Sequence, residues 1–375
     1  MNTPAYVFNI DILRERIDRI KSLIPGIELT YSIKANPFLV PYITPMVRHL
    51  EVCSPGELSI CQACHVAPEQ IIYSGLLKEE TDITEALKYG VDIITAESPR
   101  QLRIISDVST RLGMQARVLL RLTSGNQFGM DEETVVSLIR DIADYPQVTL
   151  VGIHYFSGTQ KTRSAKFDTD VKNIYSLIDA VRDQTGYDID FVEFGPGAGV
   201  EYFDEADDDK DFEHFALALT AIEALSDRVT VGIEMGRFIA SSCGRFETTV
   251  KEIKQSKGIN YVIVDGGIHH LNYYGQIQGM KIPGISVSKV RDSSDKYCIV
   301  GSLCTTADVL VREVELSQLM EGDVLIFDRC GAYSITEAPA LFLSRRMPAV
   351  YIESKNEGLR LVREGLESYR FNNEY

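Results

Sequence analysis

Short apolar runs alternate with helix-like segments between residues 28 and 237, and this alternation limits the possible folds more than any other feature. A repeated strand and helix unit predicts a parallel sheet, because a helical crossover must return the chain to the start of the next strand. Eight units in roughly 210 residues match a closed (β/α)8 barrel of the TIM type, since an open doubly wound sheet usually has fewer strands. The runs read ELTYSIKAN, LEVCSPGEL, QIIYSG, VDIITAES, ARVLLRLTS, TLVGIHYFSG, DFVEFGPGAG and VTVGIEMGR.

Most of the predicted strands finish at a polar or glycine-rich step. Parallel barrel strands end at one common face, and their C-terminal residues build the site in such folds. We therefore expect a functional site where these strands end. The ends are Lys34, Ser54, Ser74, Glu97, Arg121, His154, the turn from Gly195 to Gly199, and Glu234 with Arg237.

The chain changes character after residue 240. Runs such as FETTVKEIKQ, NYVIVDGG and DVLIFDRC alternate apolar and polar residues without regular helical segments between them. A mostly β domain is expected there, and the opening PAYVFNID reads as a strand that returns to join it. The expected division is a barrel of residues 26–239 and a β domain of residues 1–25 plus 240–375, without a flexible linker between them.

Composition excludes several classes of partner. The 375 residues, 45% of them hydrophobic, can bury a large core, and they carry a formal net charge of −16. This charge argues against nucleic acid and anionic membrane surfaces as partners. No run is long enough to span a bilayer, and MNTPAYVFNID lacks a basic segment followed by an apolar one, so we expect a cytoplasmic protein. Its seven cysteines are expected to be reduced.

No metal site is expected. CQACH at residues 61–65 matches a haem-attachment pattern, but that attachment needs export, and no second cysteine pair completes a zinc site. The acidic run at residues 204–213 lacks the glycine and the closing spacing of a calcium loop, which favours a solvated loop.

A lysine and a carboxylate are predicted to face the barrel interior together. With a period of two, Lys34 shares a strand face with the small polar residues Thr30 and Ser32. By the same rule, Glu234 shares the inward face of the last strand with Gly232. An amine and a carboxylate then occupy one pocket.

The turn EFGPGAG at residues 193–199 adds a candidate phosphate cradle. Glycines let backbone N–H groups approach an anion closely, and a helix is expected to begin beyond the turn. Arg237 supplies a second phosphate ligand. An inward lysine, a carboxylate and a phosphate site together meet the needs of pyridoxal 5'-phosphate: an imine, a partner for the ring nitrogen and a phosphate clamp.

The sequence resembles the fold type III pyridoxal phosphate-dependent decarboxylases, which include diaminopimelate and ornithine decarboxylases and share an alanine racemase-like fold. The resemblance covers nearly the whole chain and rests on YSIKANP, SPGEL, GIHYFSGTQ, EFGPGAGV, EMGRF, GSLCTTADVL and CGAYS. It implies an amino acid decarboxylase that acts as a homodimer with shared active sites.

The resemblance also implies individual roles. Lys34 would hold the cofactor as an imine, and Glu234 would pair with its ring nitrogen. Cys304 resembles the residue that a neighbouring subunit inserts into the site to protonate the product at Cα. The phosphate would be bound by Gly195, Gly197, Arg237 and Tyr333.

Two positions depart from the family pattern. Phe156 stands where the family usually has a histidine stacked on the cofactor ring, and an aromatic face can still stack. Pro196 interrupts the glycine triplet and removes one N–H donor, so phosphate binding would depend more on Arg237 and Tyr333.

Two other functions remain open besides decarboxylation. A racemase of the same fold typically meets the ring nitrogen with an arginine, and Glu234 argues against that reading. A catalytically silent relative that works by binding a partner would generally lose cofactor residues, whereas Lys34, Glu234, Arg237, Cys304 and Tyr333 are all present.

The substrate class is predicted from an acidic residue that this chain lacks after Cys304. Relatives acting on diamino acids carry an acid after the cysteine, and this chain has Thr305. A substrate whose distal end is not a free amine is therefore expected, bound with the help of Thr305, Asp308 and Arg121. Asp308 could still receive an ammonium from a shifted position, so diaminopimelate or ornithine/lysine decarboxylation is the alternative.

One basic segment hints at a tethered substrate. QKTRSAK at residues 160–166 follows the sixth predicted strand and carries Lys161, Arg163 and Lys166. These cations could dock an acidic carrier protein or a phosphate-bearing arm, although a solvated basic loop is the simpler interpretation.

Overall fold

A computed structural model describes residues 1–204 and 206–374, which form two compact units. The barrel unit comprises Ile17–Val200 and Asp211–Phe238. The β unit comprises Met1–Arg16, Glu201–Lys210 and Ile239–Tyr375. Compared with the expected division, residues 17–25 join the barrel, and residues 201–210 and 239 join the β unit.

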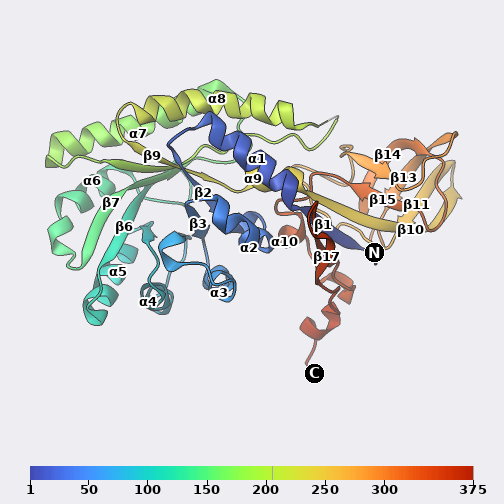
Figure 1. The fold of residues 1–375 in the computed structure, drawn as a ribbon, viewed down its shortest axis with the longest axis horizontal. Coiled ribbons are helices and arrows are strands. Elements are labelled where there is room, and N and C mark those ends of the chain that lie inside the picture. The colour runs from blue at the N-terminus through green and yellow to red at the C-terminus, as the bar shows by residue number, and fades with distance from the viewer. Residues whose placement is uncertain (205, 375) are drawn as a thin grey trace. The chain divides into compact units, whose positions relative to one another are not determined.

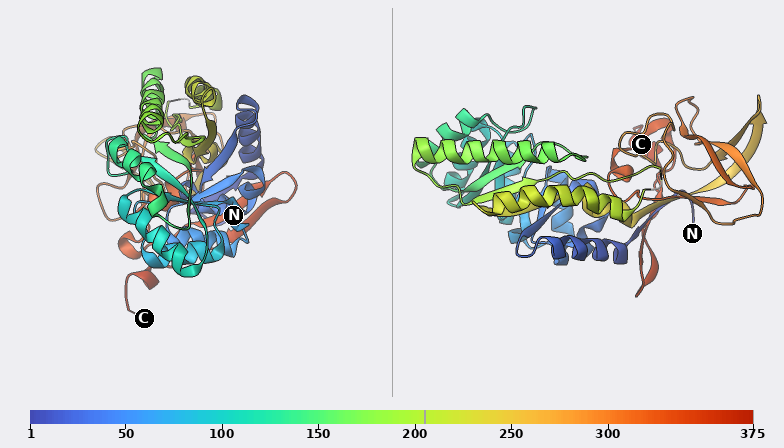
Figure 2. Two further views of the ribbon diagram at one scale, coloured as in Figure 1. Left: turned by 90° about the vertical axis from the view of Figure 1, so that its left-hand side faces the viewer. Right: turned by 90° about the horizontal axis from the view of Figure 1, so that it is seen from above.

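The barrel unit contains a closed eight-stranded parallel barrel, as the repeated units predicted. Its helices lie outside the strands in every view (Figures 1 and 2). The strands are β2 (Glu28–Ser32), β3 (His49–Val52), β4 (Ile71–Tyr73), β5 (Ile93–Ala96), β6 (Ala116–Leu122), β7 (Val148–Phe156), β8 (Phe191–Gly195) and β9 (Thr230–Met235). The helices are α1 (Ile10–Leu23), α2 (Val40–Ile43), α3 (Pro55–Ala63), α4 (Glu80–Tyr89), α5 (Pro99–Leu112), α6 (Glu132–Arg140), α7 (Ser164–Thr185), α8 (Asp208–Ser226) and α9 (Arg237–Ala240).

Local sequence sets the helix ends. The hydroxyl of Ser98 accepts a hydrogen bond from the backbone N–H of Gln101 at 3.2 Å, and Pro99 occupies the first turn of α5, where its missing N–H is not needed. The same Ser-Pro start opens α3. Gly113 ends α5 with a φ of 64°, a left-handed conformation that glycine adopts without strain.

The β unit is built on a nine-stranded mixed sheet with the path β14-β13-β11-β10-β1-β16-β17, and β12 and β15 branch from it. The opening strand β1 pairs antiparallel with β10 and parallel with β16, so the N-terminus does return to this domain. The strands are β1 (Ala5–Asn9), β10 (Gly244–Ser256), β11 (Ile259–Val264), β12 (Ile285–Val287), β13 (Ser294–Val300), β14 (Val309–Ser317), β15 (Val324–Phe327), β16 (Ala349–Ser354) and β17 (Gly358–Arg363); the short helix α10 spans Ser334–Glu337.

The acidic run is not the solvated loop that the sequence predicted. Helix α8 begins inside it at Asp208, whose carboxylate lies 2.9 Å from both Arg16 and Arg329 within the β unit. Asp211 is fully buried. Glu205, in the same run, lies outside the described residues. Across the described ranges, every helix is too short or too polar to cross a bilayer.

Candidate active site

Lys34 lies in a short 3₁₀ turn, Ile33–Ala35, directly after β2. The turn stops at Asn36, whose extended backbone is the conformation favoured before Pro37. Lys34 was predicted to end the strand, but β2 ends at Ser32 and Lys34 follows it, with 40% of its side chain exposed. The turn thus leaves the amine accessible at the C-terminal end of the strand.

Glu51, on β3, holds this amine. Its Oε2 lies 2.9 Å from Lys34 Nζ, and its Oε1 accepts the thiol of Cys53 at 3.1 Å. Burial acts to raise the pKa of Glu51, but the charges of Lys34 and His154 outweigh it and lower that pKa below its usual range. Glu51 is therefore an anion that orients the Lys34 amine.

Glu234 and His154 meet inside the barrel. Strand parity predicted an inward Glu234, and the neighbouring inward position of β9 agrees, since a Cβ on Gly232 would lie 2.3 Å from the carboxylate of Glu193. The Nε2 atom of His154, on β7, lies 3.3 Å from Oε2 of Glu234. Both side chains are buried, so the pair is shielded from solvent screening.

The strand β8 between them contributes a further buried carboxyl, Glu193, which is paired in register with His154. Burial and the nearby Glu234 raise the pKa of Glu193 well above its ordinary value. The barrel interior therefore contains three carboxyl groups with different surroundings: Glu51 at the lysine, Glu234 at the histidine, and Glu193 between strands.

The glycine turn after β8 is tightly enclosed. A Cβ on Gly195 would lie 2.7 Å from the ring of Phe156, and one on Gly197 would lie 1.9 Å from the carbonyl oxygen of Gly158. Gly197 also has a φ of 64°. The helix expected beyond this turn is α8, which begins at Asp208, eleven residues after Gly197. The turn therefore presents glycine backbone without a helix N-terminus behind it.

The loop after β7 holds the glycine turn in place. The side-chain amide of Gln160 donates to the carbonyl of Val200 at 2.9 Å and accepts from its N–H at 2.8 Å. Thr159, in the same loop, accepts from Arg237 Nε at 3.3 Å. Arg237 thus reaches the loop that faces Gly197, which brings two of the predicted phosphate ligands together within the barrel unit.

Phenylalanines fix the start of α9 behind Arg237. The ring of Phe238 lies 5.3 Å from that of Phe212 and 5.1 Å from that of Phe215, both on α8. All three are buried. This packing holds the backbone from which Arg237 extends.

Arg121 does not match the substrate role that the sequence predicted. Its guanidinium lies 3.0 Å from Glu97 and 4.7 Å from the ring centre of Phe128, and the Arg121–Glu97 pair is buried. One guanidinium nitrogen, Nε, is buried without a hydrogen-bond partner among the described residues. Arg121 is therefore engaged in a structural ion pair through Nη1, and its Nε donor remains unused.

The β unit contains Cys304, Thr305 and Tyr333. Cys304 is exposed, and Thr305 accepts the N–H of Ala307 at 3.3 Å within the same loop. Tyr333 has a φ of 64°, an uncommon conformation for a residue with a side chain. These residues belong to a different unit from Lys34 and Glu234.

Asp308 forms part of the scaffold of the Cys304 loop. Its two carboxylate oxygens accept the backbone N–H groups of Ile268 and Leu303, each at 2.8 Å, and only 3% of the residue is exposed. The predicted contact between Asp308 and a substrate therefore has no support in the geometry. The residue shapes the loop that presents Cys304.

The basic segment after β7 is only partly available for docking. Lys161 is buried and forms an ion pair with Asp170, so its predicted docking role was wrong. Arg163 and Lys166 are exposed. They border a cleft of about 430 Å³ that also includes Thr159.

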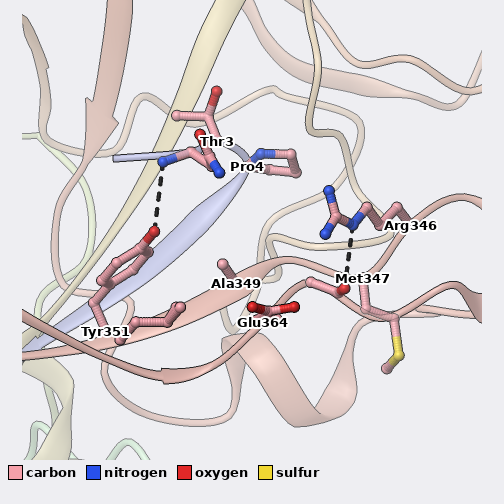
Figure 3. A pocket seen from close by; sticks show the side chains of 10 residues that line it. Thr3, Pro4, Arg346, Met347, Ala349, Tyr351 and Glu364 are labelled. Carbon is pink, nitrogen blue, oxygen red and sulfur yellow. Dashed lines mark hydrogen bonds between the residues drawn. The ribbon is translucent and has the colours of Figure 1, made fainter.

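Another pocket, of about 140 Å³, lies within the β unit and contains none of the predicted site residues. Figure 3 shows it between the N-terminal segment and strands β16 and β17, with Thr3, Arg346 and Glu364 on its walls. The backbone N–H of Asn2 donates to the hydroxyl of Tyr351 there. We assign this pocket no role in the site.

The sequence did not identify Glu51, Cys53 or Glu193 as site residues, and it placed His154 only among the strand ends. The signal for His154 was its parity, which matches that of Phe156 on β7. The same signal existed for Glu51, because the sequence HLEV of β3 alternates polar and apolar residues and Glu51 has the polar parity.

Known proteins are similar to this chain. The family model described as pyridoxal-dependent decarboxylase, pyridoxal binding domain, matches residues 10–241. Diaminopimelate decarboxylase of Aquifex aeolicus (strain VF5) is 26% identical, with 96% of this chain and 89% of that protein aligned. L-glutamyl-[BtrI acyl-carrier protein] decarboxylase of Niallia circulans is 27% identical, over 96% of this chain and 91% of that protein. The crystal structure of diaminopimelate decarboxylase from M. jannaschii in co-complex with L-lysine has the same fold, with a TM-score of 0.84 at 24% identity over 97% of this chain and 89% of that one.

Proposed function

We propose, given that the chain belongs to the pyridoxal-dependent decarboxylases, that it releases carbon dioxide from the Cα of an amino acid or aminoacyl substrate whose distal end is not a free amine. Membership makes it a pyridoxal phosphate-dependent enzyme of amino acid decarboxylation. The observation that carries the substrate proposal is Thr305, which stands directly after Cys304 where an acid would receive an ammonium.

The barrel unit fits pyridoxal 5'-phosphate. Lys34 presents an accessible amine, and ring nitrogen Nδ1 of His154 and Nε of Arg121 are buried without partners among the described residues. Only glycine fits at positions 195 and 197, because a Cβ there would overlap Phe156 or Gly158, so the turn presents bare backbone. When bound, the cofactor supplies an electron sink for the breaking bond between Cα and the carboxylate.

The protein's own groups then have separate tasks. Lys34 would hold the cofactor covalently, with Glu51 orienting its amine. Glu234 would face the ring nitrogen and keep a proton there, since a buried carboxylate favours a neighbouring positive charge. Arg237, with Thr159, would bind the phosphate.

The distal end of the substrate is assigned by what the Cys304 loop lacks. An ammonium buried against the hydroxyl of Thr305 instead of a carboxylate should lose several kcal/mol. Asp308 does not replace the missing acid, because both its oxygens are engaged by backbone N–H groups. Free lysine, ornithine and diaminopimelate should therefore be poor substrates.

Two substrate classes fit this assignment: an acidic or amide-ended amino acid, and an aminoacyl group carried by a protein. A free diamino acid does not fit it. The tethered class is supported by the Niallia circulans relative and by exposed Arg163 and Lys166. Diaminopimelate is the second candidate, supported by the Aquifex aeolicus relative and opposed by Thr305.

We also propose a homodimer in which each Cys304 enters the site of its partner. Exposure of Cys304 in the single chain supports this arrangement. Mixing inactive Lys34→Ala and Cys304→Ala proteins should restore activity, because a mixed dimer has one intact site. No restoration under exchange conditions would count against shared sites.

The deciding experiment is a carbon dioxide release assay over free amino acids and carrier-bound aminoacyl thioesters. We expect turnover of a substrate without a distal amine. Turnover of a free diamino acid with kcat/KM above roughly 10⁴ M⁻¹s⁻¹, an ordinary enzyme efficiency, would show that Thr305 had been misinterpreted. No release from any substrate, with cofactor bound, would reject the decarboxylase.

A further inference from the structure

Glu193 is a buried carboxyl group that has no role in the proposed decarboxylation. It lies on β8, in register with His154 on β7 and Gly232 on β9, and only 1% of it is exposed. Gly232 makes room for it, because a Cβ there would lie 2.3 Å from Glu193 Oε2. Oε1 of Glu193 has no hydrogen-bond partner among the described residues. The barrel thus encloses a carboxyl group in a space shaped for it.

The nearby basic side chains already lie beside other carboxylates. Lys34 lies 2.9 Å from Glu51, and His154 lies 3.3 Å from Glu234. The charges that act on Glu193 most strongly are those of Glu234, Glu51 and Glu28, all negative. Glu28, at the start of β2, lies 3.5 Å from Arg48. Among the described residues, Glu193 therefore has acidic neighbours and no ion-pair partner.

A carboxylate in such surroundings favours its neutral form. Burial and the negative neighbours raise the pKa of Glu193 and outweigh a hydrogen bond with the side chain of Thr30, which acts to lower it. An ionised group without a counter-charge is expensive to bury, so the group takes up a proton instead. Two carboxyls that share a site commonly divide one proton unequally, and their environments decide which one holds it. Here Glu234 lies beside His154, whereas Glu193 has no basic side chain within ion-pair distance among the described residues.

We propose that Glu193 is a positioning residue that stays protonated inside the barrel and thereby adds no second negative charge beside Glu234, which faces the cofactor ring nitrogen in the proposed function. The role of Glu234 in this inference rests on the proposed function. The protonation of Glu193 does not, and it can be tested without any substrate. Glutamine at position 193 copies the neutral acid in size and polarity.

The first test compares the unfolding free energies of purified wild type and Glu193→Gln between pH 4.5 and 8. A raised folded-state pKa means that the folded chain binds more protons than the unfolded chain above about pH 4.5, so the wild type loses stability as pH rises. Relative to Glu193→Gln, its folding equilibrium constant should fall about tenfold per pH unit until Glu193 ionises. Glu223→Gln, at an exposed position of α8, is the matched control.

Infrared difference spectroscopy gives an independent reading of the same group. The carbonyl stretch of a protonated carboxyl should be present in the wild type at neutral pH and missing from Glu193→Gln. A constant stability difference from pH 5 to 8, or a wild type without this band, would overturn the proposal.

The positioning role has its own readout in the pH profile. At alkaline pH Glu193 ionises and places a second negative charge beside Glu234, which should change kcat/KM in the alkaline limb of the pH profile; Glu193→Gln should lack this alkaline change. Identical alkaline limbs would reject the positioning role. If the protein releases no carbon dioxide at all, the stability and infrared results still decide the protonation of Glu193, so the two failures are distinguishable.

Discussion

The Nζ atom of Lys34 lies 2.9 Å from Oε2 of Glu51, and 40% of the Lys34 side chain is exposed whereas that of Glu51 is buried. The carboxylate therefore holds the amine from the barrel side and leaves its other side accessible. This geometry separates two properties of Lys34, its positive charge and its nucleophilic nitrogen. Substitutions can test each property alone.

Lys34→Ala should abolish covalent attachment of the cofactor and lower kcat/KM by roughly 10³-fold or more, equivalent to about 4 kcal/mol. Borohydride reduction followed by peptide mass analysis should label Lys34 in the wild type only. Lys34→Arg is the matched control, because it keeps a cation beside Glu51 without forming an imine. Wild-type carbon dioxide release by either variant would contradict the role of Lys34.

Glu51→Gln should change the acid sensitivity of the protein. The lowered pKa of Glu51 means that the folded chain binds fewer protons than the unfolded chain just below pH 4.5, so this group's stabilisation is lost as pH falls. The wild type should therefore lose stability relative to Glu51→Gln on acidification from pH 5 to 3, measured by denaturant unfolding. Parallel curves for the two proteins would argue against the ion pair with Lys34.

Lys78 offers the opposite case in the alkaline range. It is 1% exposed, its amine donates to the carbonyl of Gly75, and burial lowers its pKa to about 8 despite the opposing charge of Glu97. The folded chain then binds fewer protons than the unfolded chain between pH 8 and 10.5, so stability should rise across this window.

The comparison for Lys78 is with Lys78→Met, which has similar length and no charge. The wild type should gain up to about 1.4 kcal/mol per pH unit relative to the variant above pH 8. Chemical denaturation at pH 7, 8.5 and 10 measures this. A difference that stays constant would mean that Lys78 is solvated in the folded protein.

The fold followed closely from local pattern. Each barrel strand was visible as an apolar run, and Ser-Pro and glycine signals marked helix ends because capping depends on adjacent residues. Strand parity placed Glu234 correctly, since β9 alternates regularly. For Lys34 the amine does reach buried Glu51, but the strand ends earlier than predicted, because residues 33–35 form a 3₁₀ turn.

The remaining errors concern partners that are distant in sequence. Lys161 appeared to be a solvated cation until the fold brought Asp170 beside it, and Arg121 was paired in the same way with Glu97. Such pairs form between a strand or loop and the element that packs against it. A single sequence contains no signal that links the two partners.

Asp308 tests the distinction between a scaffold and a substrate ligand. Asp308→Ala leaves two backbone N–H groups without acceptors, so the variant should lose about 1–3 kcal/mol of stability per group and expose Cys304 to faster alkylation. Asp308→Asn keeps one acceptor oxygen and should lose less. Asp292→Asn, at an exposed site of the same unit, is the control. Unchanged stability with altered KM for diamino acids would restore Asp308 as a substrate ligand.

Thr305→Glu should convert the substrate preference. The hydroxyl of Thr305 accepts a hydrogen bond from Ala307 at 3.3 Å, so the side chain belongs to the loop that presents Cys304, and a carboxylate at this position would face a distal ammonium if Cys304 enters the site. A charge-assisted contact of this kind typically contributes about 1.5–3 kcal/mol, which corresponds to a gain of roughly 10- to 100-fold in kcat/KM for lysine, ornithine or diaminopimelate. The same change should weaken turnover of an acidic substrate through like-charge repulsion.

Thr306→Glu is the matched control for Thr305→Glu. Position 306 is exposed on the same loop, so the substitution adds the same charge one residue away. Carbon dioxide release from each diamino acid by the wild type and both variants measures the switch. Equal gains for Thr305→Glu and Thr306→Glu would reduce the effect to general electrostatics, and no gain for either would show that position 305 does not meet the distal end of the substrate.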